Sequence, residues 1–100
     1  MEIKRLSDIK ELKNWFGLGK DRRVSIESLF GIEIAFFEHI ITPIKGENKI
    51  IIKFAYPDKT DEFYYFITRS DVIMDRIEKD KELMPFFATI KKVKNYTSYE

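Results

Sequence analysis

Residues 63–99 read FYYFITRSDVIMDRIEKDKELMPFFATIKKVKNYTSY, and this stretch decides the fold. Its aromatic and β-branched runs are typical of strands, whereas its middle third has the apolar spacing of a helix. Thr68 and Ser70 are competing N-caps for that helix, and Pro85 ends it. The expected segments are a strand over 62–68, a helix over 69–83, and strands over 86–93 and 96–99.

Two further strands precede this stretch. Residues 32–41 form a long apolar run whose alternation shifts phase at Phe36 and Phe37, which predicts a β-bulge there. Residues 49–56 alternate regularly, and we expect a loop over 42–48 between the two strands. The resulting order, β-β-β-α-β-β, is that of a five-stranded OB-like barrel, a fold that commonly binds single-stranded nucleic acid or oligosaccharide.

The 100 residues are expected to form a single domain in two parts. Residues 1–23 carry a short N-terminal amphipathic helix, which opens at the N-cap Ser7, and then a basic loop that ends at Arg23. The apolar stripe of this helix consists of Ile9, Leu12, Trp15 and Phe16. Residues 24–100 would form the barrel.

The composition of the chain excludes several kinds of site and indicates where the charges lie. The chain has no cysteine, which excludes disulfides, Fe–S clusters and a thiol nucleophile. No signal peptide and no membrane-length apolar run is recognisable, so we expect a cytoplasmic protein, in the host cytoplasm if the source is viral. The net charge of +1 is uneven: residues 1–23 hold seven basic and four acidic residues, and residues 24–100 hold eleven and thirteen. The barrel part is therefore not basic overall, which argues against strong non-specific DNA binding.

Residues 32–100 resemble a group of small phage and mobile-element proteins. The resemblance rests on a strand that ends in Thr68-Arg-Ser70, a helix that ends in Leu83-Met-Pro-Phe86, an Ala88-Thr-Ile90 strand and a tyrosine-rich last strand. Proteins of this group look like single-domain OB-fold proteins, and some are taken to bind single-stranded DNA. The resemblance therefore implies an OB fold and a role in phage or mobile-element DNA metabolism.

The aromatic strand Phe63–Phe66 is the first candidate binding element. Exposed aromatic side chains can stack nucleobases irrespective of sequence. We expect Phe63, Tyr65 and Ile67 to fill the barrel and Tyr64 and Phe66 to face a ligand. Apolar residues on both faces of a strand are equally compatible with burial on both sides.

Lysines on the loops that border the usual OB groove are the second candidate element. They could hold phosphates, although a solvated loop is the commoner role of such residues. The candidates are Lys45, Lys49, Lys53, Lys91, Lys92 and Lys94.

We expect no enzyme, because no nucleophile, base and orienting group can be assembled from the sequence. His39 is the only histidine and has no cysteine partner for a metal, so no metal or other cofactor is expected. The predicted function is binding of single-stranded nucleic acid, DNA preferred, through strand aromatics and loop lysines. The alternative is a small protein-binding module, an inhibitor or adaptor that could counter host defence, without nucleic-acid activity. A third option is a structural subunit of a virion or its assembly.

Overall fold

The computed structural model of the chain describes residues 15–100. Ser7, Ile9 and Leu12, with most of the expected N-terminal helix, lie outside the described residues. Trp15 and Phe16 form the short 3-10 helix η1 (Trp15–Gly17).

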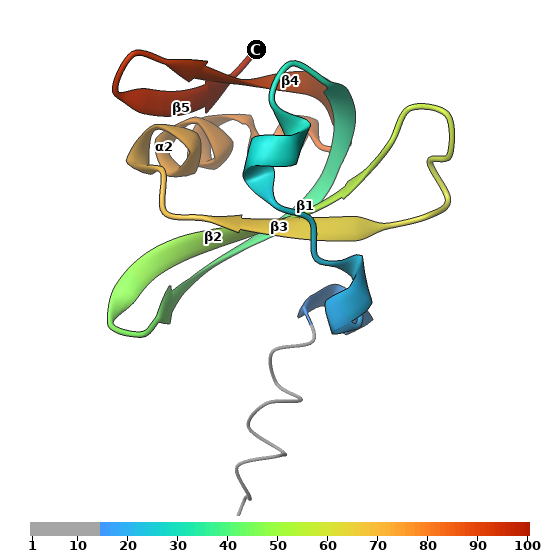
Figure 1. Cartoon of the computed structure of the whole chain (residues 1–100), viewed down its shortest axis with the longest axis horizontal. Helices are drawn as coiled ribbons and strands as arrows, with labels where there is room; N and C mark the ends of the chain where they lie inside the picture. Colours follow the sequence, from blue (N-terminus) through green and yellow to red (C-terminus); the bar gives the residue numbers. More distant parts are fainter. Residues whose placement is uncertain (1–14) are drawn as a thin grey trace, which may run out of the picture.

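The described part is a single antiparallel sheet with one α-helix (Figure 1). The strands lie in the order β3-β2-β1-β4-β5. Their bounds are β1 Glu33–Ile44, β2 Glu47–Ala55, β3 Tyr64–Thr68, β4 Phe86–Val93 and β5 Tyr96–Tyr99. Helix α2 (Asp71–Asp80) follows β3 and continues into the 3-10 helix η4 (Lys81–Leu83). The predictions of a mainly β chain and of a helix between the third and fourth strands are confirmed.

Strands β3 and β5 are the two edges of the sheet, and no ladder joins them within residues 15–100. The segment that contains η2 (Lys20–Arg22) and η3 (Ile26–Leu29) instead connects β3 with β4. It makes a parallel bridge from Arg23 to Tyr65 in β3 and another from Phe30 to Ile90 in β4. In Figure 1, α2 lies between β3 and the β4–β5 hairpin.

The first strand bends at its predicted bulge. The pairing of β1 with β2 shifts register between Phe36 and Glu38, next to the phase change in the sequence. Residues 33–36 pair with β4, and of these only Ala35 and Phe36 also pair with β2, whereas the later part of β1 pairs only with β2. A bulge increases the local bend and twist, so β1 can pair with β4 at one end and with β2 along the rest of its length.

The expected loop over 42–48 is wrong. Strand β1 continues through Pro43 to Ile44, and β2 begins at Glu47. The turn consists of Lys45 and Gly46, whose φ angles are 53° and 83°. Positive φ at both central residues is the two-residue hairpin turn that matches the twist of the flanking strands.

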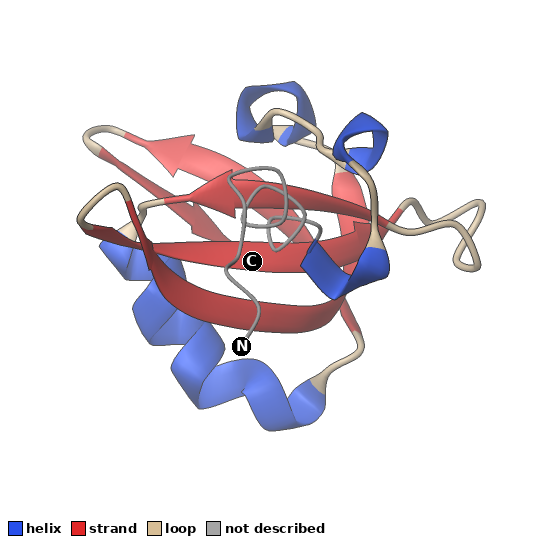
Figure 2. Ribbon diagram, turned by 90° about the horizontal axis from the view of Figure 1, so that it is seen from below, coloured by secondary structure: helices blue, strands red, loops and turns tan. Residues whose placement is uncertain are grey.

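The core lies between one face of the curved sheet and α2, which covers that face in Figure 2. Its largest fully buried side chains are Leu29, Ile34, Phe36, Ile50, Ile52, Phe54, Phe66, Ile73, Ile77 and Ile90. Ile51 and Tyr65, which point to the other face, are also buried. The apolar residues on both faces of β3 therefore reflect burial on both sides. Within residues 15–100, no helix has the length and hydrophobicity that a membrane crossing requires.

Candidate nucleic-acid interface

The structure places Tyr64 and Phe66 on the core side of β3, which is the reverse of the predicted orientation. Phe66 is fully buried and pairs with Ile52, and Tyr64 pairs with Phe54. This register places Tyr64 and Phe66 on the side of the sheet that packs against α2. Residues that are directly opposite in neighbouring strands share a face, so the core residues of β2 fix which side of β3 is internal. Phe66 is therefore a core residue and cannot stack a nucleobase in the folded protein.

Tyr64 is half-buried, and its ring already has partners. It packs against Phe54 and Tyr56, with ring centroids 6.0 and 5.4 Å away. The guanidinium carbon of Arg22 lies 5.0 Å from the centroid of the same ring. These contacts hold the basic loop against β3, which is a structural role for both side chains.

Two of the predicted lysines are engaged elsewhere. Lys53 Nζ lies 2.9 Å from a carboxylate oxygen of Glu38 and 4.2 Å from the ring centroid of Phe63. Lys91 pairs with the carboxylate of Glu100, and this hydrogen bond lowers the pKa of Glu100. Both ammonium groups are thus matched by a carboxylate on the surface of the sheet.

The other lysines lie near two adjoining clefts. The first, here called the hairpin cleft, lies beside the β1–β2 turn and has a volume of about 410 Å³. Its lining consists of Trp15, Lys20, Arg23, Ile44, Lys45, Lys49, Tyr65 and Ile67. Among these described residues four are cationic and none is acidic. This lining therefore carries positive charge only.

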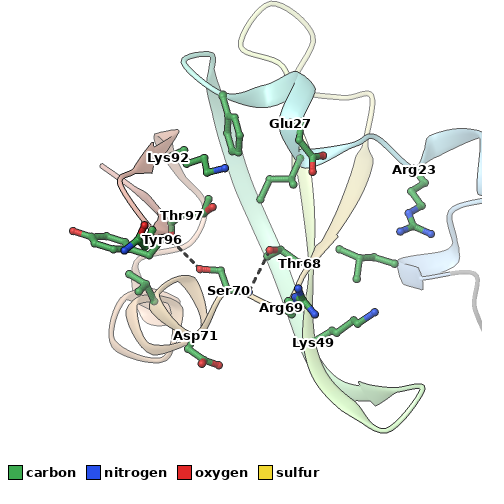
Figure 3. A pocket seen from close by; sticks show the side chains of 15 residues that line it. Arg23, Glu27, Lys49, Thr68, Arg69, Ser70, Asp71, Lys92, Tyr96 and Thr97 are labelled. Atoms are coloured by element: carbon green, nitrogen blue, oxygen red, sulfur yellow. Dashed lines mark hydrogen bonds between the residues drawn. The ribbon is translucent and has the colours of Figure 1, made fainter.

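The second hollow, here called the edge cleft, lies between the edge of β3 and the β4–β5 hairpin, with a volume of about 630 Å³ (Figure 3). Three stretches form most of its wall: 26–30 around η3, 67–72 at the start of α2, and 95–97 at the last turn. It shares Arg23, Lys49 and Ile67 with the hairpin cleft. The two clefts therefore form one continuous depression along the β3 edge.

The edge cleft carries a mixed charge with a cationic excess. Its cations are Arg23, Lys49, Arg69 and Lys92, and its acids are Glu27 and Asp71. Figure 3 shows Arg23, Arg69 and Lys49 on one side and Lys92 across the cleft on the hairpin. Arg69 also lies 3.7 Å from a carboxylate oxygen of Glu47, in a pair that is largely exposed. Exposed pairs of this kind are weak and can exchange partners with a phosphate.

Ser70 fixes the floor of the edge cleft. Its hydroxyl accepts a hydrogen bond from the Ile73 amide at 3.2 Å and donates one to the Thr97 carbonyl at 2.7 Å. Of the two N-caps that the sequence offers, Ser70 is the one used, and Thr68 Oγ1 accepts from the Ser70 amide. Arg76, further along α2, donates to the Tyr99 carbonyl. These two side chains tie two carbonyls of the edge strand β5 to α2.

Tyr96 is the aromatic residue that the sequence reasoning missed as a candidate. It begins β5 directly after the Lys94-Asn95 turn, borders the edge cleft and is 48% exposed. Because it pairs with Val93, its ring lies on the face of the hairpin opposite Lys92. Arg23 and Arg69 were also missed, because they reach the clefts from separate segments. A tyrosine next to a basic hairpin turn was the available signal for Tyr96. Lys94 lies at the tip of that turn, with a φ of 52°, and is exposed.

Within residues 15–100, no three histidine, aspartate or glutamate side chains converge to form a potential metal site. His39 instead lies 3.7 Å from a carboxylate oxygen of Glu78 in α2. Comparisons with protein-family models, with curated proteins and with solved structures found no match to this chain.

Proposed function

We propose that the protein binds single-stranded nucleic acid, with DNA as the preferred form, along the depression made by the hairpin and edge clefts. The observation that carries this proposal is the hairpin cleft, where Lys20, Arg23, Lys45 and Lys49 gather without an acidic neighbour in the lining. Single-stranded nucleic-acid sites combine such a cationic groove with aromatic surfaces for the bases. Trp15 lines the hairpin cleft and can supply such a surface, and Tyr96 adds an exposed ring at the rim of the edge cleft.

The proposal includes a more specific assignment of the fold. We infer that the chain is an OB-like module in which residues 23–30 bridge the gap between β3 and the β4–β5 half of the sheet. The supporting facts are the strand order, the bulged first strand and the two bridges at Tyr65 and Ile90. In OB folds the ligand lies over the second and third strands, between the first and the last hairpin loops. The two clefts lie between the corresponding turns here. The role in phage or mobile-element DNA metabolism that the sequence resemblance implies is part of the same proposal.

The test is a fluorescence-anisotropy titration of the full chain with a labelled oligo-dT at two salt concentrations, repeated with oligo-U. Saturable binding that weakens as salt rises supports the proposal, because release of counterions from neutralised phosphates drives such binding. Tighter binding of oligo-dT than of oligo-U supports the DNA preference. No saturable binding at low salt contradicts the proposal.

A protein-binding module is the second candidate, and one surface favours it. Leu83 and Phe87 are 69% and 55% exposed and border a separate hollow with Phe86 and Tyr99. Exposed large apolar residues that lie together often mark protein interaction sites. If no oligonucleotide binds, this surface becomes the better candidate, and replacing Leu83 and Phe87 by serine should then abolish binding to the partner without unfolding the chain.

A further inference from the structure

Glu27 is an unexpected residue in a site for a polyanion. The edge cleft contains two carboxylates, and Asp71 has a structural explanation in the first turn of α2, where a negative charge interacts favourably with the helix dipole. Glu27 is exposed on η3, and Figure 3 shows its carboxylate directed into the cleft. A phosphate cannot lie against it without repulsion.

The state of this carboxylate is well defined. The Ser25 hydroxyl donates a hydrogen bond to it, which is the main cause of a lowered pKa of Glu27, and the charge of Lys92 lowers that pKa further. The group is therefore ionised at neutral pH and acts only as an acceptor. Its two oxygens offer about four lone-pair sites, so the bond from Ser25 leaves room for further donors.

The cleft around Glu27 has the composition of a base-binding pocket. Ile26, Ile67 and Val72 provide the apolar surface of its wall. The volume of about 630 Å³ lies in the range typical of small-ligand pockets. Apolar walls with a few polar groups that fix orientation are what such pockets require.

Among the nucleobases, guanine matches these polar groups best. Its Watson–Crick edge, which is free in a single strand, presents two adjacent donors, N1–H and the N2 amino group, and the acceptor O6. A carboxylate can accept both donors side by side, as it does from the paired N–H groups of arginine. Thymine and uracil present one N–H between two carbonyls, so one carboxylate oxygen would face a carbonyl.

We propose that the edge cleft is a guanine-selective subsite, in which Glu27 accepts hydrogen bonds from N1–H and N2 while Lys92 donates to O6 and the base packs against the apolar wall of the cleft. This inference rests on the proposed nucleic-acid function and adds base selectivity to it. The phosphates of the same strand would lie along the cationic hairpin cleft.

The test uses three labelled dodecamers of dT in which the central base is guanine, hypoxanthine or thymine. Hypoxanthine keeps N1–H and O6 and lacks the N2 amino group, so it reports on the second hydrogen bond alone. We expect the guanine oligomer to bind about 5- to 100-fold more tightly than the thymine oligomer. The hypoxanthine oligomer should fall between them.

The variant that isolates the carboxylate is Glu27→Gln, with Glu82→Gln as the control, since Glu82 is exposed and outside both clefts. Glu27→Gln should reduce the guanine preference to near unity and leave binding of the thymine oligomer unchanged or slightly tighter. Glu82→Gln should keep the wild-type preference. Equal affinities of the three oligomers for the wild-type chain, or an unchanged preference in Glu27→Gln, would overturn the inference. In those cases salt-dependent binding of the thymine oligomer leaves the proposed function standing, whereas no binding of any oligomer overturns both.

Discussion

The inner face of β2 and β3 and the β4–β5 hairpin treat aromatic side chains differently. Phe54 and Phe66 on the inner face are fully buried, with ring centroids 5.8 Å apart. Tyr96 on the hairpin borders the edge cleft and is 48% exposed. The two regions use the same kind of side chain at different places in the sheet. Residues in the middle of a ladder are enclosed by neighbouring strands and by α2. A residue beside a hairpin turn at the sheet edge has neighbours on fewer sides.

This contrast separates stability from binding. The aromatic cluster of β2 and β3 should contribute to the free energy of unfolding, because it removes large apolar surfaces from water. The aromatic and cationic residues of the clefts should contribute mainly to ligand affinity. Substitutions in the two regions should therefore affect different measurements.

The largest effect is expected for Phe66→Ala. The cavity left in the core should lower the free energy of unfolding by about 3–5 kcal/mol, as measured by urea denaturation. The control Tyr96→Ala should change stability by less than about 1 kcal/mol, because the ring is half exposed. A Phe66→Ala variant with the stability of the wild type would show that the burial of β3 is wrongly assigned.

Tyr96→Ala should instead weaken binding of oligo-dT by about 1–3 kcal/mol, which is the range for one stacked base. Phe87→Ala is the matched control, since Phe87 is 55% exposed and lies outside both clefts. An anisotropy titration of the two variants compares them directly. Equal affinities for both would remove Tyr96 from the site.

Ser70 lines the edge cleft, but its side chain caps α2 and bonds to β5, so Ser70→Ala should lower the free energy of unfolding. Loss of the N-cap should cost about 0.5–2 kcal/mol, and the Thr97 carbonyl loses its donor as well. The exposed Ser28 offers the control substitution Ser28→Ala, for which we expect a smaller loss in the same urea experiment. If the two variants are equally stable, the link between α2 and β5 contributes nothing measurable.

The smallest effect is expected for Lys91→Ala. The ion pair of Lys91 with Glu100 is exposed, and such pairs contribute about 0–1 kcal/mol to stability. Affinity for oligo-dT should also stay close to that of the wild type, because Lys91 lines neither cleft. A clear loss of affinity would extend the interface to Lys91, on the face of the hairpin that it shares with Tyr96.

Local sequence signals were enough for much of the fold. The bounds of β4 and β5, the bulge after Phe36 and the position of α2 follow from alternation, phase change and capping residues that are close together in the chain. The short turn at Lys45 and Gly46 was missed because Pro43 and Gly46 both favour a break, and only the strand pairing shows which one interrupts the ladder. The interior side of β3 was also missed, since it depends on register with β2.

The site was less predictable than the fold for a physical reason. Lys45, Lys49 and Lys92 were found as lysines near turns, but Arg23, Arg69 and Tyr96 come together only when three separate segments meet at the β3 edge. Lys53 and Lys91 have the same local pattern as the cleft lysines. They differ because Lys53 pairs with Glu38 on the neighbouring strand and Lys91 pairs with Glu100 at the end of the chain, and neither pairing can be predicted from the adjacent sequence.

The most direct test of the cleft as the nucleic-acid site compares two double variants that remove the same charge. Lys45→Ala with Lys49→Ala changes the hairpin cleft, and Lys53→Ala with Lys91→Ala changes lysines outside both clefts. The measurement is the slope of log affinity for oligo-dT against log salt concentration. The cleft variant should bind more weakly at low salt and show a slope flatter by up to about 1.4, from about 0.7 for each phosphate that is no longer neutralised, while the control keeps the wild-type slope. The same slope and affinity in both double variants would contradict the assignment of the nucleic-acid site to these clefts.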